Sequence, residues 1–146
     1  APMEESREYP SRPFIGVGVV VLKGDSVLLI RRGKPPKAGE WSLPGGSQDT
    51  GETVRDTARR EVREETGVLV GEPQFLEVVD AIIPDDEGRI RFHYTLIDFY
   101  AEWDSGDPAA ADDAAHAEWI PFSKLDELDM WEKTREIIAQ ARRERG

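Results

Sequence analysis

Residues 46–68 of the chain read GSQDTGETVRDTARREVREETGV, and this stretch is the most informative part of the sequence. Neither proline nor glycine occurs in residues 53–66, and Gly67 follows directly, which predicts a helix that ends at a glycine cap. Three glutamates then share one face of this helix: Glu61, Glu64 and Glu65. Like charges so close together repel one another, and a divalent cation removes the repulsion. Carboxylate oxygens at this spacing suit Mg²⁺ or Mn²⁺.

The order of the fixed residues in this stretch matches a known pattern. After Gly46 come five residues, then Glu52, then seven residues, and the stretch closes with Arg60-Glu61-Val62-x-Glu64-Glu65-x-Gly67-Val68. This resembles the Nudix box of the Nudix hydrolases at every fixed position. The approach to the box, Gly39-x-Trp41-x-x-Pro44-Gly45-Gly46, is also similar to this family. One departure is Asp49, where many members carry Glu, but the negative charge is kept.

The resemblance implies an α/β fold, the Nudix-type α/β/α sandwich with a mixed β-sheet between helices. The local patterns agree with it. Apolar runs predict strands at residues 14–22, 26–30, 75–83 and 90–103, with a strand end at 118–121, and an amphipathic pattern predicts a second helix at 130–143. An acidic loop is expected at 104–115. We expect one domain, residues 13–146, after an N-terminal extension, residues 1–12, that we expect to be flexible.

Composition limits the class of partner. The net charge is −11, which argues against broad binding to nucleic acid or to an anionic membrane. No run approaches the ~20 apolar residues that a membrane span needs. There is no cysteine, so disulfides and thiolate metal sites are excluded. The first residues show no signal-like stretch, and we expect a cytoplasmic protein. The expected partner is a small nucleotide, and a homodimer is left open.

The resemblance assigns roles to the acidic residues. We expect Glu61 and Glu65 to be the primary metal ligands, with Glu64 completing the set or holding a metal-bound water, and the Gly46 carbonyl adding a backbone ligand as in relatives. The metal is expected to be Mg²⁺, with Mn²⁺ as a substitute. Glu52 could reach the same cluster or pair with Arg60, for which we favour a structural role.

The general base has several candidates. We favour Asp112 or Asp113, in the middle of the acidic loop, since this segment could fold over the site. Glu52 and Glu64 within the box are the alternatives. Asp107 and Glu118 are also near in sequence, and His93 and His116 rank below the carboxylates.

Substrate contacts are expected from four further residues. Arg31 and Arg32 end a strand next to the site, and alternation along the strand allows at most one of them to touch a phosphate. Trp41 is either a base-stacking platform or, as we favour, part of the core. Pro84 lies sixteen residues after Val68, and a proline at this offset resembles the members that split ADP-ribose.

The expected reaction is therefore metal-dependent hydrolysis of a pyrophosphate bond in a nucleoside diphosphate linked to a second group, with ADP-ribose or a related nucleotide sugar as first choice. The alternative is a nucleoside triphosphate pyrophosphohydrolase that removes oxidised nucleotides. A third reading, from a different class, is a nucleotide-binding Nudix module without hydrolysis. Retention of all four glutamates weighs against it.

Overall fold

The computed structural model of the chain describes residues 7–33, 39–108 and 114–146. In these residues two α-helices, a short 3₁₀ helix and eight strands follow one another along the chain. The elements are β1 (Phe14–Lys23), β2 (Ser26–Arg32), β3 (Trp41–Ser42), β4 (Gly45–Ser47), α1 (Val54–Thr66), β5 (Leu69–Val70), β6 (Gln74–Pro84), β7 (Ile90–Ser105), β8 (Ala114–Pro121), η1 (Phe122–Glu127) and α2 (Glu132–Arg145).

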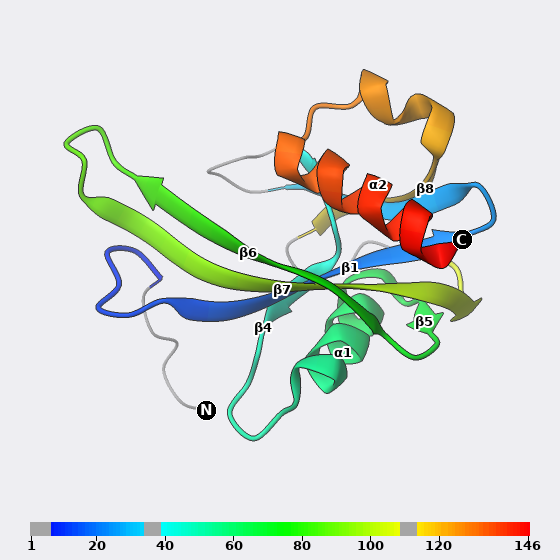
Figure 1. Cartoon of the computed structure of the whole chain (residues 1–146), viewed down its shortest axis with the longest axis horizontal. Coiled ribbons are helices and arrows are strands. Elements are labelled where there is room, and N and C mark those ends of the chain that lie inside the picture. Colours follow the sequence, from blue (N-terminus) through cyan, green and yellow to red (C-terminus); the bar gives the residue numbers. More distant parts are fainter. Residues whose placement is uncertain (1–6, 34–38, 109–113) are drawn as a thin grey trace.

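β1 lies at the centre of a mixed sheet (Figure 1). One edge of β1 runs parallel to β7, with Phe14 opposite Tyr94 and Leu22 opposite Glu102. The other edge is shared, because β4 pairs with the beginning of β1 and β2 pairs with its end. β6 and β8 continue the sheet as antiparallel partners of β7 and β2. The predicted mixed sheet is confirmed. β2 and β4 pair with different parts of β1.

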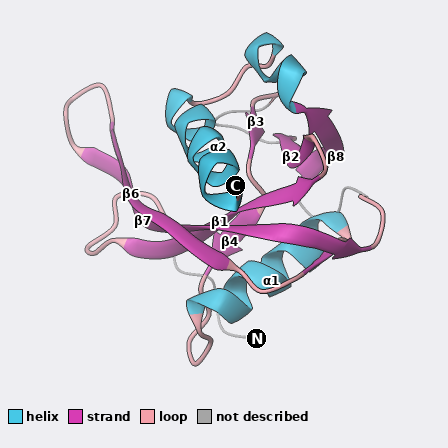
Figure 2. Cartoon of the chain, turned by 45° about the vertical axis from the view of Figure 1, so that its right-hand side comes forward, coloured by secondary structure: helices cyan, strands magenta, loops and turns pink. Residues whose placement is uncertain are grey.

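The two helices cover opposite faces of the sheet, so the predicted sandwich is confirmed (Figure 2). Alternation along β1 divides its side chains between two cores. Val19 and Val21 pack with Ala58 and Val62 of α1, whereas the other face packs against Ile137 and Ile138 of α2. No helix in the described part of the chain is both long and apolar enough to cross a bilayer.

Helix α1 forms as its sequence predicts, because both of its ends are capped. The Thr53 side chain accepts a hydrogen bond from the Asp56 N–H at 3.1 Å. At the other end Gly67 adopts the left-handed conformation, with φ at 77°, and its N–H donates to the Arg63 carbonyl. Its buried side chains lie along one stripe, so the glutamates are left on the remaining surface.

Two element boundaries differ from the expectation. β8 begins at Ala114, four residues before the predicted strand end, because residues drawn from the expected acidic loop pair with β2. α2 begins at Glu132, and Trp131 stands at its N-cap with 40% of its surface exposed, not on the apolar face of the helix. Small residues such as Ala114 have little strand preference of their own, so only the partner strand makes them extended.

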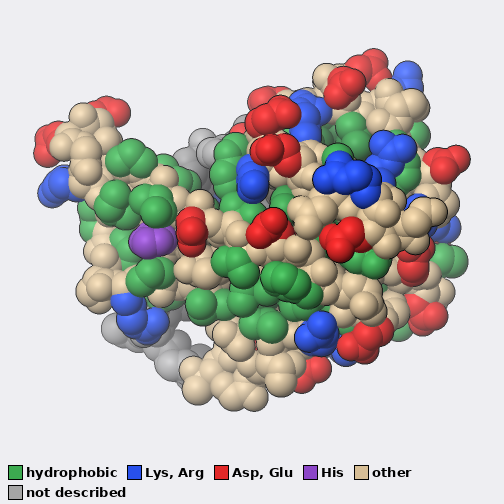
Figure 3. Space-filling view, viewed as in Figure 1, with side chains coloured by type: hydrophobic (Ala, Val, Ile, Leu, Met, Phe, Trp, Pro, Cys, Tyr) green, Lys and Arg blue, Asp and Glu red, His purple; other side chains and the backbone are tan. Residues whose placement is uncertain are grey.

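The β6–β7 hairpin projects from the body of the molecule and carries exposed apolar side chains on its surface (Figure 3). Phe75, Val78 and Ile82 are each about half exposed. The described part of the N-terminal extension lies against this hairpin, where the Tyr9 N–H donates to the Arg91 carbonyl and its hydroxyl donates to Asp85 at 2.9 Å.

One carboxylate lies inside the sheet. Asp98 of β7 is only 5% exposed. The pKa of Asp98 is raised from an ordinary 3.8 to about 7, mainly by burial and also by the negative charge of Glu77, whereas a hydrogen bond from the Gly18 backbone and the charge of Lys133 act in the opposite direction. The folded chain therefore keeps a proton on Asp98 in a pH range where the unfolded chain has released it.

This pKa shift predicts how stability changes with pH. Between about pH 4 and 7 the folded state binds the extra proton, so the contribution of Asp98 to stability falls as pH rises through this window and stays low above it. Asp98→Asn cannot ionise. We expect its free energy of unfolding, relative to the natural chain, to increase by roughly 2–3 kcal/mol between pH 5 and pH 8. Urea denaturation at both pH values measures the difference. The exposed Asp80→Asn is the control, and an equal difference at both pH values for Asp98→Asn would contradict the shift.

Candidate active site

Strand β4 brings the chain into contact with helix α1 because it contains two glycines. A Cβ at Gly45 would lie 1.9 Å from the Val17 carbonyl oxygen, and a Cβ at Gly46 would lie 2.4 Å from the carboxylate of Glu61. Real Cβ atoms do not come so close to other atoms, so neither position accepts a side chain without rearrangement. The absence of a side chain at Gly46 allows the Glu61 carboxylate to lie directly against the backbone of β4.

The three glutamates of α1 face this strand in different environments. Glu65 accepts a hydrogen bond from the Gly45 N–H at 2.9 Å. The side chain of Glu61 is 16% exposed, and burial raises its pKa. Glu64 is the most exposed of the three, at 43% of its side chain. The helix thus holds one carboxylate on the strand, one partly buried beside it and one open to solvent.

Arg60 joins these carboxylates to the loop before the helix. Its Nε donates to Glu52 at 2.6 Å, which confirms the predicted pair. Its Nη1 donates to Glu61 at 2.8 Å and to Glu64 at 3.1 Å. Its Nη2 reaches the Ser47 carbonyl at 3.0 Å. One guanidinium therefore holds the loop, the strand and the helix together, as its planar set of donors allows.

Glu52 is the most strongly anchored of the four acidic residues. In addition to Arg60, it accepts hydrogen bonds from the Thr57 hydroxyl at 2.7 Å and from the Asp49 N–H at 3.1 Å. The pKa of Glu52 falls to about 2, mainly because of the hydrogen bond from Arg60; the bonds from Thr57 and Asp49 also lower it, and burial acts in the opposite direction. Glu52 is thus ionised at neutral pH, and its oxygens are engaged in holding Arg60.

The donor set suits a hard divalent cation, because it consists of carboxylate oxygens beside a bare backbone. Among the described side chains, however, no three acidic or histidine groups already stand in a metal-binding arrangement. Three of the carboxylates point at the Arg60 guanidinium, and Glu65 points at the Gly45 N–H. Binding a metal therefore requires side-chain rotation, for which Glu64 has the most room.

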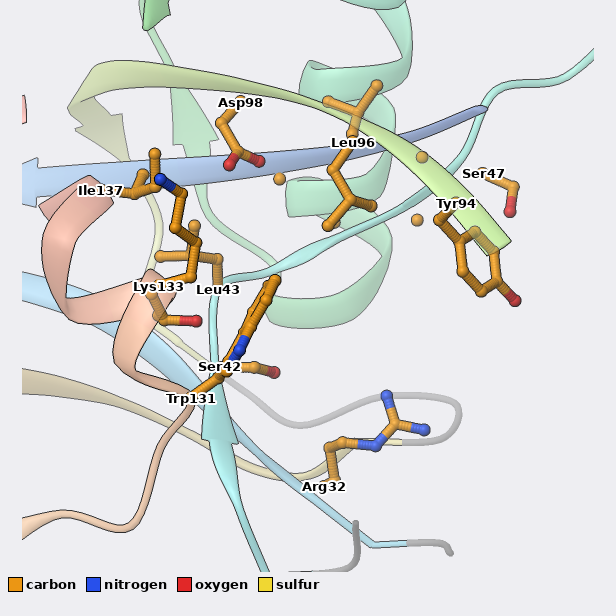
Figure 4. Close-up of a pocket in the computed structure, with 16 residues that line it drawn as sticks. Arg32, Ser42, Leu43, Ser47, Tyr94, Leu96, Asp98, Trp131, Lys133 and Ile137 are labelled. Atoms are coloured by element: carbon orange, nitrogen blue, oxygen red, sulfur yellow. The ribbon is translucent and has the colours of Figure 1, made fainter. Parts of the chain in front are cut away.

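A pocket of about 350 Å³ opens beside β4, between the sheet and the start of α2 (Figure 4). Its walls include Leu43, Leu96 and Trp131, and Asp98 and Lys133 lie together at one end. Gly46 and Ser47 also line it, so the pocket borders the strand that the glutamates contact. A planar or apolar group bound here would lie next to the acidic cluster.

A second hollow, of about 450 Å³, lies on the other side of Ser47. It is lined by Arg7 and Arg12 together with residues 47–52 of the loop before α1. Arg7 donates a hydrogen bond to the Ser47 hydroxyl, and its guanidinium lies 4.8 Å from the centre of the Phe14 ring. Ser47 lines both hollows, which therefore lie on either side of one residue of β4.

The structure separates the residues expected to contact substrate. Arg32 lines the pocket and Arg31 is not among its lining residues. Trp41 packs against the core on the α2 side and makes an edge contact with His116, and the aromatic rings in the pocket belong to Tyr94 and Trp131 instead. Pro84 lies near the tip of the hairpin, in a third hollow with Tyr9.

The candidate bases are also spread out. Asp112 and Asp113 lie outside the described residues. Glu118 pairs with His116 at 2.7 Å on β8, and the Asp107 carbonyl lies near Gly67, beyond the end of α1. Of the expected bases in the described residues, Glu52 and Glu64 lie in the cluster.

Most of the pocket residues were not expected from the sequence, among them Asp98, Trp131 and Lys133. A signal existed for Asp98, because it is a lone acid in the apolar run YTLIDFYA. Nothing local distinguishes Lys133 from the other cations of its helix. It joins the pocket only because α2 packs its first turn against the sheet.

Known proteins resemble this chain in sequence and in fold. A sequence profile of the NUDIX domain matches residues 12–141. The ADP-ribose pyrophosphatase of Methanocaldococcus jannaschii is 34% identical over 116 residues, which are 80% of this chain and 66% of that protein. Putative 8-oxo-dGTP diphosphatase 2 of Mycobacterium tuberculosis is 33% identical over 133 residues, 88% of each chain. The crystal structure of a MutT NUDIX hydrolase from Burkholderia pseudomallei is 30% identical, has a TM-score of 0.77 and covers 89% of this chain and 98% of that one.

The profile spans the whole sheet, every residue that lines the pocket beside β4, and most of α2. The chain belongs to the NUDIX hydrolase family.

Proposed function

We propose that the chain uses a divalent metal ion to hydrolyse the pyrophosphate bond of a nucleoside diphosphate linked to a second group, with ADP-ribose or a related nucleotide sugar as the first choice. The observation that carries this proposal is that two hollows lie on either side of Ser47, and that Glu52 of the acidic cluster lines the second of them. A molecule with a bulky group on each side of a diphosphate matches this shape. Its base would occupy the pocket with Trp131, and its diphosphate would lie beside Gly46 and the glutamates.

The metal ligands in this proposal are Glu61, Glu65 and Glu64, with the Gly46 carbonyl as a backbone ligand. Mg²⁺, for which Mn²⁺ is a substitute, supplies positive charge that neutralises the phosphates as the bond breaks. Arg60 keeps Glu61 and Glu64 near each other despite their like charges, and Glu52 holds Arg60 in place. Glu65, anchored by the Gly45 N–H, fixes the helix to the strand.

For the general base, the described residues favour Glu64 over Glu52. Glu64 is open to solvent and can rotate, whereas Glu52 is engaged by Arg60, Thr57 and Asp49. Asp112 and Asp113 stay candidates from the loop between β7 and β8. Replacement of either loop residue by Asn tests them, since a base acts chiefly on kcat.

A purine nucleoside triphosphate, including an oxidised one, is the second candidate substrate. Arg7 and Arg12 of the second hollow support it, because guanidinium groups bind terminal phosphates, although Asp49 and Glu52 in the same lining balance their charge. The mycobacterial relative, which is named for 8-oxo-dGTP, also matches over the larger share of its length. The first choice draws on the two-sided shape of the site and on the ADP-ribose pyrophosphatase relative. Pro84 lends it little support, because it lies at the hairpin tip.

Removal of divalent metal should abolish hydrolysis. Treatment with EDTA followed by dialysis is expected to leave no turnover, because the phosphate charge is then unneutralised beside four glutamates. Addition of Mg²⁺ or Mn²⁺ should restore the rate, whereas Na⁺ at equal ionic strength should not. Undiminished turnover in metal-free buffer would rule out the proposed chemistry.

Glu65→Gln should lower kcat by about 10²–10³-fold, the scale of losing one electrostatic contribution of ~3–4 kcal/mol. The amide oxygen of Gln can still accept the Gly45 N–H, so the melting temperature without metal should change little. Glu72→Gln is the matched control, because Glu72 pairs with Arg59 on the surface, away from β4. A fall in melting temperature with an unchanged kcat would make Glu65 a structural residue only.

A substrate panel separates the remaining readings. We expect ADP-ribose to exceed deoxynucleoside triphosphates in kcat/KM, with AMP and ribose 5-phosphate as products identified by chromatography. Release of pyrophosphate from a triphosphate, with ADP-ribose untouched, would favour the second candidate. Turnover of no member in Mg²⁺ would point to a nucleotide-binding module without hydrolysis.

A further inference from the structure

The pocket beside β4 has one polar end in otherwise mostly apolar surroundings. Asp98 projects from β7 and Lys133 from the first turn of α2, and the Lys133 ammonium points toward the Asp98 carboxylate (Figure 4). Leu43, Leu96 and the Trp131 ring lie between this end and the mouth of the pocket. A flat ring that entered along Trp131 would bring its far edge to an anionic acceptor and a cationic donor.

The backbone around Asp98 is shaped for a carboxylate. A Cβ at Gly18 would lie 2.5 Å from Asp98 Oδ1, so a residue with a side chain there would displace the acid. The Gly18 N–H donates a hydrogen bond to the Asp98 carboxylate, which has the capacity to accept others. An apolar side chain would fill this buried position without the loss of hydration that a carboxylate suffers. Packing alone therefore does not explain Asp98.

We propose that Asp98 and Lys133 are specificity-determining residues that select a purine by the edge of its six-membered ring. Asp98 accepts an N–H of the base, and Lys133 donates to the neighbouring acceptor atom. Adenine offers this pair as its amino group and N1, and a 6-oxopurine offers it as N1–H and O6. The inference rests on the proposed function, since it takes the pocket to hold the base of the substrate.

Sugar hydroxyls are the other ligand that a carboxylate commonly binds. The walls of the pocket favour a base, because Trp131 and the two leucines present flat or apolar surface that suits ring stacking. At pH 8 Asp98 is mostly ionised, given its pKa of about 7, and is then an acceptor only. Binding experiments at this pH therefore examine one protonation state.

Calorimetric binding of nucleoside monophosphates at pH 8 tests the proposal, because both candidate reactions release such a product. Three ligands differ stepwise in what they offer to the pocket. AMP has the N–H donor and the acceptor, purine riboside 5′-monophosphate keeps N1 but lacks the amino group, and ribose 5-phosphate has no base. Asp98→Leu removes the acceptor at similar size, and Lys133→Met removes the charge but keeps most of the stem.

We expect Asp98→Leu to weaken AMP binding about tenfold or more, the effect of losing one hydrogen bond to a charged group. It should change the affinity for purine riboside 5′-monophosphate and ribose 5-phosphate by less than about twofold. Lys133→Met should weaken both purine ligands and spare ribose 5-phosphate. Asp98→Asn, which keeps an acceptor oxygen, should restore part of the AMP affinity. Lys124→Met, an exposed charge on η1, is the control and should bind all three ligands as the natural chain does.

Several outcomes would overturn the proposal. An equal loss for all three ligands in Asp98→Leu would mean that Asp98 only maintains the pocket, and a loss for ribose 5-phosphate alone would place the sugar at this end. Failure of the natural chain to bind AMP would also overturn the proposal. Melting temperatures confirm that the variants fold. Turnover in the substrate panel is a separate measurement, so loss of hydrolysis with an intact binding pattern would refute the proposed function and leave base selection standing.

Discussion

The close approach of helix α1 to strand β4 is the constraint on which the site depends. Gly45 and Gly46 leave no side chain between the strand, β1 and the helix, and the space that a Cβ would occupy at Gly46 is filled by the Glu61 carboxylate. The same strand forms part of the wall of the pocket beside β4 and of the second hollow, lined by Arg7 and Arg12. Two adjacent glycines therefore determine how near the acidic cluster lies to any molecule bound on either side.

Arg60 resolves the electrostatic conflict that this approach creates. Several carboxylates within one turn of a helix and the preceding loop repel one another, and partial burial of Glu61 increases the cost. The guanidinium contacts Glu52, Glu61 and Glu64 together, and Glu52 is the partner that it holds most fully. A lysine would bring the same charge but not the fork of donors that spans these groups. The cluster is consequently organised by residues that need not touch a substrate.

The sequence predicts the parts of the molecule that depend on local chemistry. Helix α1 has a cap at Thr53 and a glycine at its end, and its glutamates follow a spacing that is visible in the chain alone. The start of β8 at Ala114 could not be predicted, because this segment is extended only through its pairing with β2. The pocket was also hidden, since Ser42, Asp98 and Lys133 come from three distant segments. Trp41 and Trp131 look alike in sequence, and only packing sends the first to the core and the second to the pocket.

The buried acid on β7 has a consequence for the way in which this chain could change under selection. Hydrophobic burial favours many replacements for Asp98, because a neutral side chain there avoids desolvation of a charge. A laboratory screen for heat resistance that ignored substrate choice would therefore enrich replacements at position 98 early. If Asp98 selects the base as proposed, survivors of such a screen would fold better and discriminate less between bases. Folding stability and discrimination between bases then make opposite demands on residue 98. This is the common trade-off between stability and activity, confined to a single side chain.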